Sequence, residues 1–144
     1  MEKYSVYSLA DVTVTVNNPS VGQCVVSKEG GGRLVINRNG DLSSHTMTAT
    51  GYVVVNKMRN VAGSISLEMP QNSPSDKYFR KLIKFLTNAS TDQFALTTIT
   101  INDPAGEKVI TGTGMTPQRW PDDNYDQTSS TRNYVFLTAE IAET

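Results

Sequence analysis

The stretch GSISLEMPQNSPSDKYFRKLIKFLTN, residues 63–88, contains two periodicities that together indicate the architecture. In its first part, apolar Ile65, Leu67 and Met69 alternate with polar residues. Successive side chains of a β-strand point to opposite faces of a sheet, so this alternation is typical of a strand with one buried face. The period then changes to that of a helix, which predicts a strand followed at once by a helix that packs on a sheet.

The helix in this stretch has a clear start. Ser73 is placed as an N-cap, Pro74 as the first helical residue and Asp76 as an acidic residue at the third helical position. We expect a helix over about residues 74–87. Its apolar residues trace one stripe: Tyr78, Phe79, Leu82, Ile83 and Leu86.

Alternation elsewhere predicts further strands. Residues 11–17 alternate valine with polar residues, and residues 133–141 alternate in a similar way. Residues 45–56 are predicted to form one strand that is interrupted by a bend at Gly51. In residues 93–102 the alternation slips by one position, as a β-bulge would cause.

These elements predict a mainly β protein in which a single helix packs on a sheet. Its 144 residues suit a single domain, 1–144. The Asn39-Gly40-Asp41 sequence predicts a hairpin turn between two strands. Long loops are expected at 17–33, 38–44 and 115–132, and a loop of the last length is usually functional or disordered.

Composition argues against several functions. The formal net charge is −1, whereas a protein that grips nucleic acid usually has a basic surplus. No apolar run approaches the roughly 18 residues that a membrane-spanning helix needs. A single cysteine, Cys24, and an N-terminus without a signal-peptide pattern favour synthesis in a reducing cytoplasm.

Residues that could carry chemistry are few. His45 is the only histidine and Cys24 the only cysteine, so a zinc site would depend on carboxylates, which is unusual. The acidic run Asp122-Asp123…Asp126 lacks the ligand spacing of a calcium-binding loop. We therefore expect no enzyme activity, no catalytic residues, no cofactor and no metal site.

Two groups of residues are candidates for protein contacts. Arg119-Trp120 combines two residue types that often anchor interfaces, although Trp120 could equally pack on its own domain. The basic residues of the expected helix form either a solvated face or a surface that meets acidic loops of a neighbouring subunit. These basic residues are Lys77, Arg80, Lys81 and Lys84.

Taken in order, several motifs resemble those of bacteriophage tail tube proteins, in particular structural proteins of contractile-tailed phages. The resemblance is clearest over residues 4–90. It rests on these runs: Tyr7-Ser8…Asp11-Val12-Thr13-Val14-Thr15, Asn18-Pro19, Thr48-Ala49-Thr50-Gly51-Tyr52-Val53, Gly63-Ser64-Ile65-Ser66-Leu67 and Met69-Pro70-Gln71-Asn72-Ser73-Pro74.

The resemblance implies a β-sandwich or half-barrel of antiparallel strands with one flanking helix. It also implies a virion protein, made in the host bacterial cytoplasm, that assembles with itself. Six copies would form a ring, and stacked rings would form a tube that conducts genomic DNA and the tape measure protein. Baseplate and tail-terminator proteins are the implied partners, together with a sheath protein if the tail is contractile. DNA would pass through without specific binding.

Within such a tube we expect strand faces rich in hydroxyls to line the channel, because a polar, weakly acidic wall does not hold phosphates. The predicted channel-lining residues are Thr46, Thr48, Thr50, Ser64, Ser66 and Glu68. The predicted contacts with other subunits or with a sheath are Gly30, Gly31, Gly32, Asn39, Asp41, Lys77, Arg80, Lys81, Lys84, Arg119 and Trp120.

Two alternatives stay open at this point. A tube protein of a phage-derived particle or of a type VI injection machine would share this fold and mechanism. A carbohydrate- or receptor-binding β-sandwich is a different class, in which Trp120 and Tyr125 would stack on a sugar.

Overall fold

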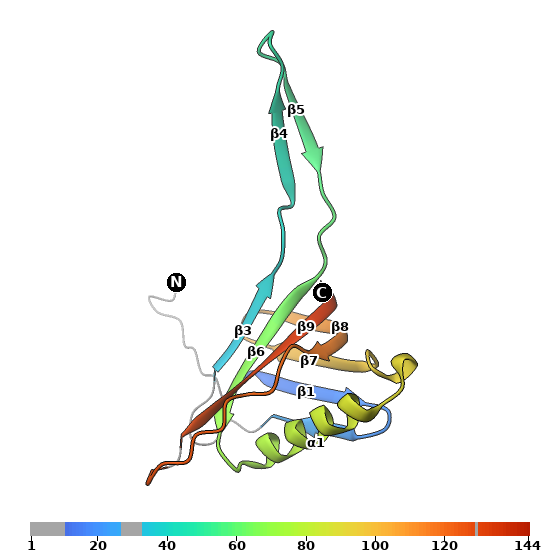
Figure 1. The fold of residues 1–144 in the computed structure, drawn as a ribbon. Coiled ribbons are helices and arrows are strands. Elements are labelled where there is room, and N and C mark those ends of the chain that lie inside the picture. Colours follow the sequence, from blue (N-terminus) through green and yellow to red (C-terminus); the bar gives the residue numbers. More distant parts are fainter. Residues whose placement is uncertain (1–10, 27–32, 129) are drawn as a thin grey trace, which may run out of the picture.

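The structure, a computed structural model, describes residues 11–26, 33–128 and 130–144. Most of these residues are in antiparallel strands, with one α-helix, α1 (Pro74–Asn88), and one short 3-10 helix, η2 (Thr91–Gln93) (Figure 1). The strands are β1 (Thr13–Asn18), β2 (Gly22–Val25), β3 (Arg33–Arg38), β4 (Ser43–Met47), β5 (Val53–Lys57), β6 (Gly63–Pro70), β7 (Thr97–Asp103), β8 (Lys108–Pro117) and β9 (Thr131–Glu143).

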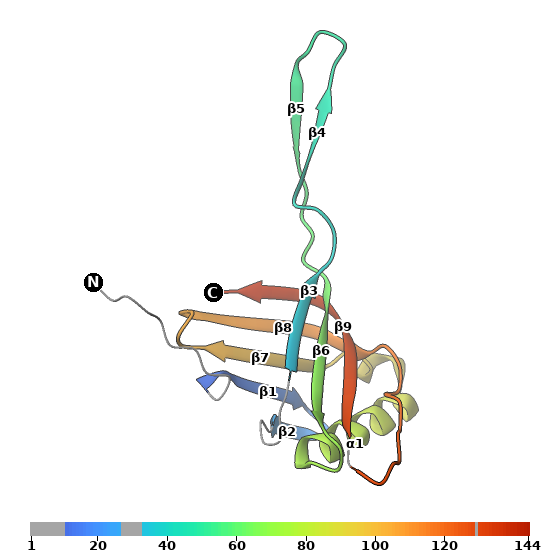
Figure 2. The ribbon, with the colours of Figure 1, turned by 90° about the vertical axis from the view of Figure 1, so that its left-hand side faces the viewer.

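Seven strands form one open sheet in the order β2-β1-β7-β8-β9-β6-β3. The long strand β9 joins the two halves of this sheet, because Thr131–Thr138 pairs with β6 and Phe136–Glu143 pairs with β8. Figure 2 shows β9 turning between the two halves, so that β3 and β6 run in a different direction from β1, β7 and β8. The sheet ends at β2 and β3, and the half-barrel that the sequence predicted is therefore open, with a free edge at each end among the described strands.

The core lies between one face of the sheet and α1. The alternation in residues 63–70 is confirmed, since Ile65, Leu67 and Met69 are buried. Phe79 of α1 is fully buried, with its ring centroid 5.4 Å from the rings of both Tyr134 and Phe136. Burying one such side chain stabilises a fold by about 1.5–3 kcal/mol.

The start of α1 is also as predicted. The backbone N–H of Asp76 donates to the Ser73 hydroxyl at 3.2 Å, and Pro74 occupies the first helical position. Near the first turn of the helix, the Tyr78 hydroxyl donates to the Gly22 carbonyl at 2.6 Å and so holds the edge strand β2. Burial raises the pKa of Tyr78 to about 12.

Residues 45–56 differ from the prediction, because they form a hairpin and not one bent strand. β4 and β5 pair with each other, and the chain reverses at residues 48–52. Gly51 has a φ of +85°, a left-handed conformation that glycine adopts without strain, and the N–H of Thr48 donates to the Tyr52 carbonyl at 2.8 Å. The glycine that was expected to bend a strand therefore closes a turn.

The predicted hairpin turn at Asn39-Gly40-Asp41 is wrong for a related reason. These residues connect β3 to β4, and the two strands do not pair, since β3 lies on β6 while β4 lies on β5. Gly40 still has a positive φ of +76°. The local turn signal was present, but sequence does not show which strands a turn joins.

Three other segments refine the prediction. The bulge in residues 93–102 is confirmed by a register shift between Thr97 and Ile99, but Phe94 and Leu96 precede β7 and are exposed. The expected loop at 17–33 contains β2, and residues 27–32 lie outside the described part of the chain. The expected loop at 115–132 is shorter, because β8 continues to Pro117 and β9 starts at Thr131.

Candidate assembly surfaces

The sheet face opposite α1 is rich in small polar side chains. In β1, Thr13 and Thr15 alternate with the buried Val14 and Val16. Paired residues of antiparallel strands point to the same side of the sheet. The residues of β7 that pair with Thr13 and Thr15, and the residues of β8 that pair with those, therefore lie on the same face. We call it the threonine face, and its polar members are Thr13, Thr15, Asn17, Thr98, Thr100, Asn102, Thr111, Thr113, Thr116, Ser64, Ser66, Glu68, Arg33, Asn37, Asn133 and Glu140.

Few ionisable residues of the described strands lie on this side. Arg33 pairs with Glu68 near one end, and Glu140 pairs with Thr113. The Thr131 hydroxyl donates to Glu68 Oε1 at 2.9 Å, and the Ser66 hydroxyl lies 2.7 Å from Asn133 Oδ1. Val35 and Leu137, which pair with Ser66 and Ser64, are exposed apolar residues of the same face. Hydroxyls and amides outnumber charged groups on this face, whereas roughly 25–35% Lys, Arg, Glu and Asp is the usual aim for a designed surface that faces bulk solvent.

The predicted channel-lining residues occupy two separate places. Ser64, Ser66 and Glu68 lie on the threonine face. Thr46 is in β4, and Thr48 and Thr50 are in the turn of the hairpin, with their hydroxyl oxygens 3.1 Å apart. The prediction missed the larger part of the face, on β1, β7 and β8. The alternation of threonine with valine or isoleucine in 13–16 and 98–101 was the signal that could have found it.

The β4–β5 hairpin and its two connections, residues 42–58, form an arm that projects well away from the sheet (Figures 1 and 2). One side of the arm is polar, because Asn56 Nδ2 donates to the hydroxyls of Ser44 and Thr46, both at 3.2 Å. The other side presents His45, Met47, Val53 and Val55. We call this the apolar side of the arm.

Nothing in the described chain covers the apolar side of the arm. Met47 is 73% exposed and Val55 is 65% exposed, and Tyr52 at the tip is 70% exposed. A two-stranded hairpin is at best marginally stable alone, and contiguous exposed apolar side chains mark interaction sites. The apolar side of the arm is therefore a candidate interaction surface. Asn39 and Asp41 lie at its base and are exposed.

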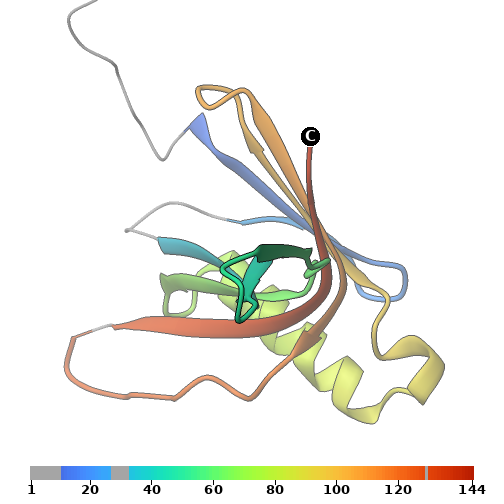
Figure 3. The same ribbon diagram turned by 90° about the horizontal axis from the view of Figure 1, so that it is seen from above.

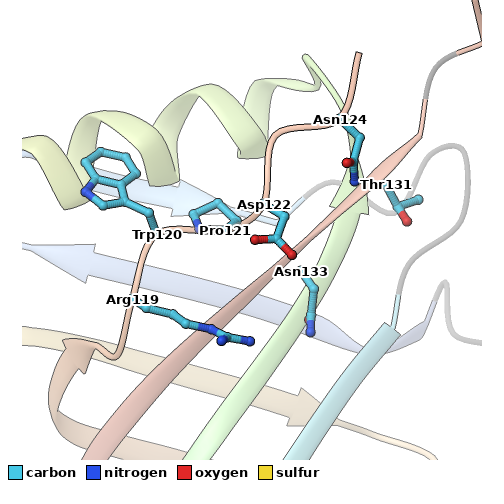
Figure 4. Close-up of a pocket in the computed structure, with 7 residues that line it drawn as sticks. All are labelled: Arg119, Trp120, Pro121, Asp122, Asn124, Thr131 and Asn133. Carbon is cyan, nitrogen blue, oxygen red and sulfur yellow. The ribbon is translucent and has the colours of Figure 1, made fainter. Parts of the chain in front are cut away.

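A second apolar surface lies at the C-terminal end of α1. A groove there is lined by Ile83, Thr87, Phe94, Pro117, Gln118, Arg119 and Trp120. Phe94, Leu96 and Trp120 are all exposed large apolar residues. Figure 4 shows that the neighbours Arg119 and Trp120 diverge, with Trp120 beside α1 and Arg119 reaching across β9 toward Asn133.

Charged side chains fix the segment 118–128 to the body. Arg80 Nη1 lies 2.7 Å from Asp123 Oδ1, and its guanidinium carbon lies 5.7 Å from the centre of the Trp120 ring. The Arg80 hydrogen bonds hold the pKa of Asp123 below its usual value, and the same contact raises the pKa of Arg80. Trp120 thus packs on its own chain, while its outer surface stays exposed.

The predicted basic contact residues have different surroundings. Arg80 is engaged with Asp123 of the same chain, whereas Lys77, Lys81 and Lys84 are exposed on α1. Gly30, Gly31 and Gly32 lie outside the described residues. Among the described residues, no group of three or more His, Cys, Asp or Glu side chains is placed to hold a metal ion. No helix in this part of the chain has the length and apolar character needed to cross a membrane.

This fold is shared with chains of solved cap, sheath–tube and tail assemblies. The anti-feeding prophage tube-terminating cap superposes with a TM-score of 0.62 at 12% identity, covering 100% of this chain and 94% of that one. The sheath–tube complex of PVC, an extracellular contractile injection system, gives a TM-score of 0.58 at 11% identity, with 99% and 93% covered. The tail of an empty GTA particle, computed with C6 symmetry, gives 0.61 at 12% identity, with 96% and 99% covered.

The fold therefore places the chain in the class of tail-tube-like β-proteins. Its sequence identifies the family more closely. Residues 4–144 match the family described as the Bacteriophage PhiTE tail tube protein, and the chain belongs to that family. The predicted resemblance to phage tail tube proteins is confirmed, and the family is one of structural proteins, not of enzymes. Among curated proteins the sequence has no significant match.

Proposed function

We propose that this protein builds the wall of a phage tail tube, with six copies in each ring, stacked rings, and the threonine face turned toward the bore. The threonine face carries this proposal. A wall of hydroxyls and amides is wetted by water but offers few cations to hold phosphates, so DNA can slide along it. The tape measure protein would pass through the same bore.

The open sheet supports self-assembly. β2 and β3 are edge strands of this sheet, and unpaired strand edges are templates for pairing with another chain. In a ring, the β2 edge of each copy can meet the β3 edge of its neighbour, so a closed ring leaves neither edge exposed. The similar tail of the GTA particle was computed with C6 symmetry, which favours six copies per ring.

The same comparison supports a proposal about partners at the tube surface and ends. Similar chains occur in a sheath–tube complex, in a tube-terminating cap and in a baseplate. We infer that this protein meets a sheath, a terminator and a baseplate in the same way. Its place is then the virion tail, after synthesis in the host bacterial cytoplasm.

Negative-stain microscopy of the concentrated protein, combined with cysteine labelling, tests the proposal. Thr100→Cys in a Cys24→Ser background places a thiol on the threonine face, and Lys81→Cys places one on the exposed side of α1. In assembled tubes we expect a small maleimide to label both variants. A polymer-linked maleimide too large for the bore should label the Lys81→Cys variant alone.

Two results would contradict the proposal. Equal labelling of both variants by the large reagent would place the threonine face outside the tube. A protein that stays monomeric at every concentration would contradict the proposal as a whole.

A further inference from the structure

We propose that Asn39-Gly40 is a site of spontaneous covalent modification, where the Asn39 amide converts to aspartate and isoaspartate in the folded protein. This is the only Asn-Gly pair in the sequence. The hairpin turn that it predicted was wrong, so strand pairing does not account for the pair. The reaction does not depend on the proposed tube, because it needs only the folded chain and water.

The reaction is an intramolecular acyl transfer followed by hydrolysis. The backbone nitrogen of Gly40 attacks the side-chain carbonyl carbon of Asn39, a C–N bond forms, and the side-chain amide leaves as ammonia with the Gly40 proton. Water then opens the cyclic imide at either carbonyl, which gives aspartate or isoaspartate. Glycine favours the first step, because it has no Cβ to obstruct the approach to its nitrogen. Two groups held next to each other also react without the entropy loss of an encounter.

The structure leaves both reacting groups accessible. Asn39 and Gly40 are exposed, between two strands that do not pair with each other. Within the described chain, neither the Asn39 side chain nor the Gly40 N–H has a hydrogen-bond partner. Ring closure therefore breaks no hydrogen bond of the fold, and the Gly40 N–H can lose its proton to water.

Other asparagines of the described chain are less favourably placed. Asn56 Nδ2 donates to the hydroxyls of Ser44 and Thr46, and Asn88 Nδ2 donates to the Lys84 carbonyl at 3.2 Å. A hydrogen-bonded side chain must first give up its partner before it can react. Every asparagine other than Asn39 is also followed by a residue that has a Cβ. The fold and the sequence thus select the same position.

The modified residue would lie where the chain leaves the sheet for the arm. Figures 1 and 3 show that the arm joins the body only through its two connections. At this base, the Asn60 side-chain amide donates to the Asp41 carbonyl, and a Cβ on Gly40 would lie 2.7 Å from Asn60 Cγ. An isoaspartyl link adds a methylene to the backbone next to Gly40. The tight contact with Asn60 cannot absorb it, so the base of the arm loosens.

The added negative charge should matter less than the added methylene. The new carboxylate would adjoin Arg38, whose Nη2 lies 3.1 Å from Glu143 Oε1, with both side chains 49% exposed. Ion pairs between exposed side chains contribute little to stability. We therefore expect isoaspartate, and not aspartate, to change the base of the arm.

Mass spectrometry of the full-length protein tests the site. The purified protein is kept in warm, mildly alkaline buffer, with circular dichroism to verify that it stays folded. A lysine-specific protease then releases residues 29–57, which contain Asn37, Asn39 and Asn56. We expect Asn39 to convert at least tenfold faster than either of the others, with more isoaspartate than aspartate. Equal conversion of the three asparagines, or none at Asn39, would overturn the proposal.

Asn39→Gln is the matched control, because it keeps the amide but would have to form a larger ring. Isoaspartate is measured as methyl groups that a protein isoaspartyl methyltransferase transfers from S-adenosylmethionine to the aged protein. We expect at least tenfold less label on Asn39→Gln than on the unmodified sequence. Equal label on the two proteins would place the isoaspartate elsewhere in the chain and contradict the proposal.

Limited proteolysis tests the effect on the arm. Arg59 is exposed at the base, in the connection that returns from the arm to β6. We expect trypsin to cut after Arg59 at least tenfold faster in the isoaspartyl form than in fresh protein. Freshly purified Asn39→Asp has the charge without the methylene and should be cut as slowly as the fresh protein. Equal cutting of all three would contradict the loosened base.

Discussion

Asp76 and Arg132, 56 positions apart in the sequence, form an ion pair in which both side chains are almost fully buried. Arg132 Nη1 lies 2.5 Å from Asp76 Oδ2, and the side chains are 4% and 1% exposed for Arg132 and Asp76 respectively. Asp76 Oδ1 also accepts the Tyr134 hydroxyl at 2.6 Å, and burial together with this hydrogen bond raises the pKa of Tyr134. This cluster joins the first turn of α1 to β9, at the opposite end of the helix from the groove.

Loss of the Asp76 carboxylate should destabilise the monomer strongly. Asp76→Ala removes the buried partner of Arg132 and leaves only the partly exposed Asp123, whose Oδ1 lies 3.1 Å from Arg132 Nε. Loss of one partner of a buried ion pair typically costs about 3–5 kcal/mol of unfolding free energy, and the remaining contact should keep the cost near the lower end. Urea denaturation followed by circular dichroism measures the change. The double variant Asp76→Ala/Arg132→Met should lose less than the sum of the two single changes, because it leaves no uncompensated charge. Additive losses would show that the ion pair does not couple α1 to β9.

The contact between Arg80 and Asp123 should open in acid. The folded pKa of Asp123 lies below its ordinary value of 3.8, so the contact contributes its full stability above that value and loses it as pH falls through the lowered pKa. Trp120 is the only tryptophan and lies beside Arg80, so its fluorescence reports the change. We expect a constant emission from pH 7 to about 4 and a shift below it.

Substitution of Asp123 should reproduce the acid form at neutral pH. Asp123→Asn is expected to shift the Trp120 emission at pH 7 and to remove most of its change in acid. The control is Asp122→Asn, at an exposed neighbour that lines the polar hollow of Figure 4. Trp120 emission that follows pH identically in all three proteins would mean that Asp123 does not hold this segment.

A side chain at Gly63 should disrupt the junction between β3 and β6. An added Cβ would collide with the Asn37 carbonyl oxygen and lie 2.6 Å from Ile141 Cδ1. Since backbone cannot yield as a flexible side chain does, we expect Gly63→Ala to lower the unfolding free energy by about 1–3 kcal/mol. Gly51→Ala is the matched control. Its Cβ would meet nothing within 4 Å, and its positive φ affects only the arm, so global stability should change by less than about 1 kcal/mol.

Removal of the arm should leave the body folded. None of its residues belongs to the hydrophobic core, and Met58 N–H donates to the Leu42 carbonyl at 2.9 Å, so the two ends of the arm are adjacent. A short Gly-Ser linker in place of residues 43–57 should therefore change the unfolding free energy by less than about 1 kcal/mol. Tube yield in negative stain should fall below detection. An unfolded product would instead show that the arm is needed by the body itself.

Much of the local structure could be predicted from the sequence. The helix start at Ser73-Pro74 and the alternation around Ile65 depend on residues within a few positions of each other, and the structure has both. The bulge at Thr97 was likewise visible as a slip in the pattern. The Asn39-Gly40 turn and the bend at Gly51 were predicted wrongly, because a glycine shows where the chain can turn but not which strands come together.

The candidate surfaces required more than local pattern. The threonine face spans strands that are up to about a hundred residues apart in sequence, and only the pairing order places Thr15, Thr100 and Thr111 side by side. The groove depends on the meeting of α1, residue Phe94 and the start of the segment 118–128. The exposure of Met47 and Tyr52 also became evident only when the arm proved to lie apart from the sheet.

The class of structure was already contained in the order of residues: strands with one buried side and a single capped helix. Those properties follow from short-range preferences for burial and backbone conformation, which each residue expresses with its near neighbours. Three other properties emerged only from the folded chain. They are which polar strand sides form one continuous face, which apolar residues stay outside the core, and how Arg80 holds the acidic segment 122–126 against the body. They depend on long-range contacts, and the free energy that selects such contacts depends on the packing of the whole chain.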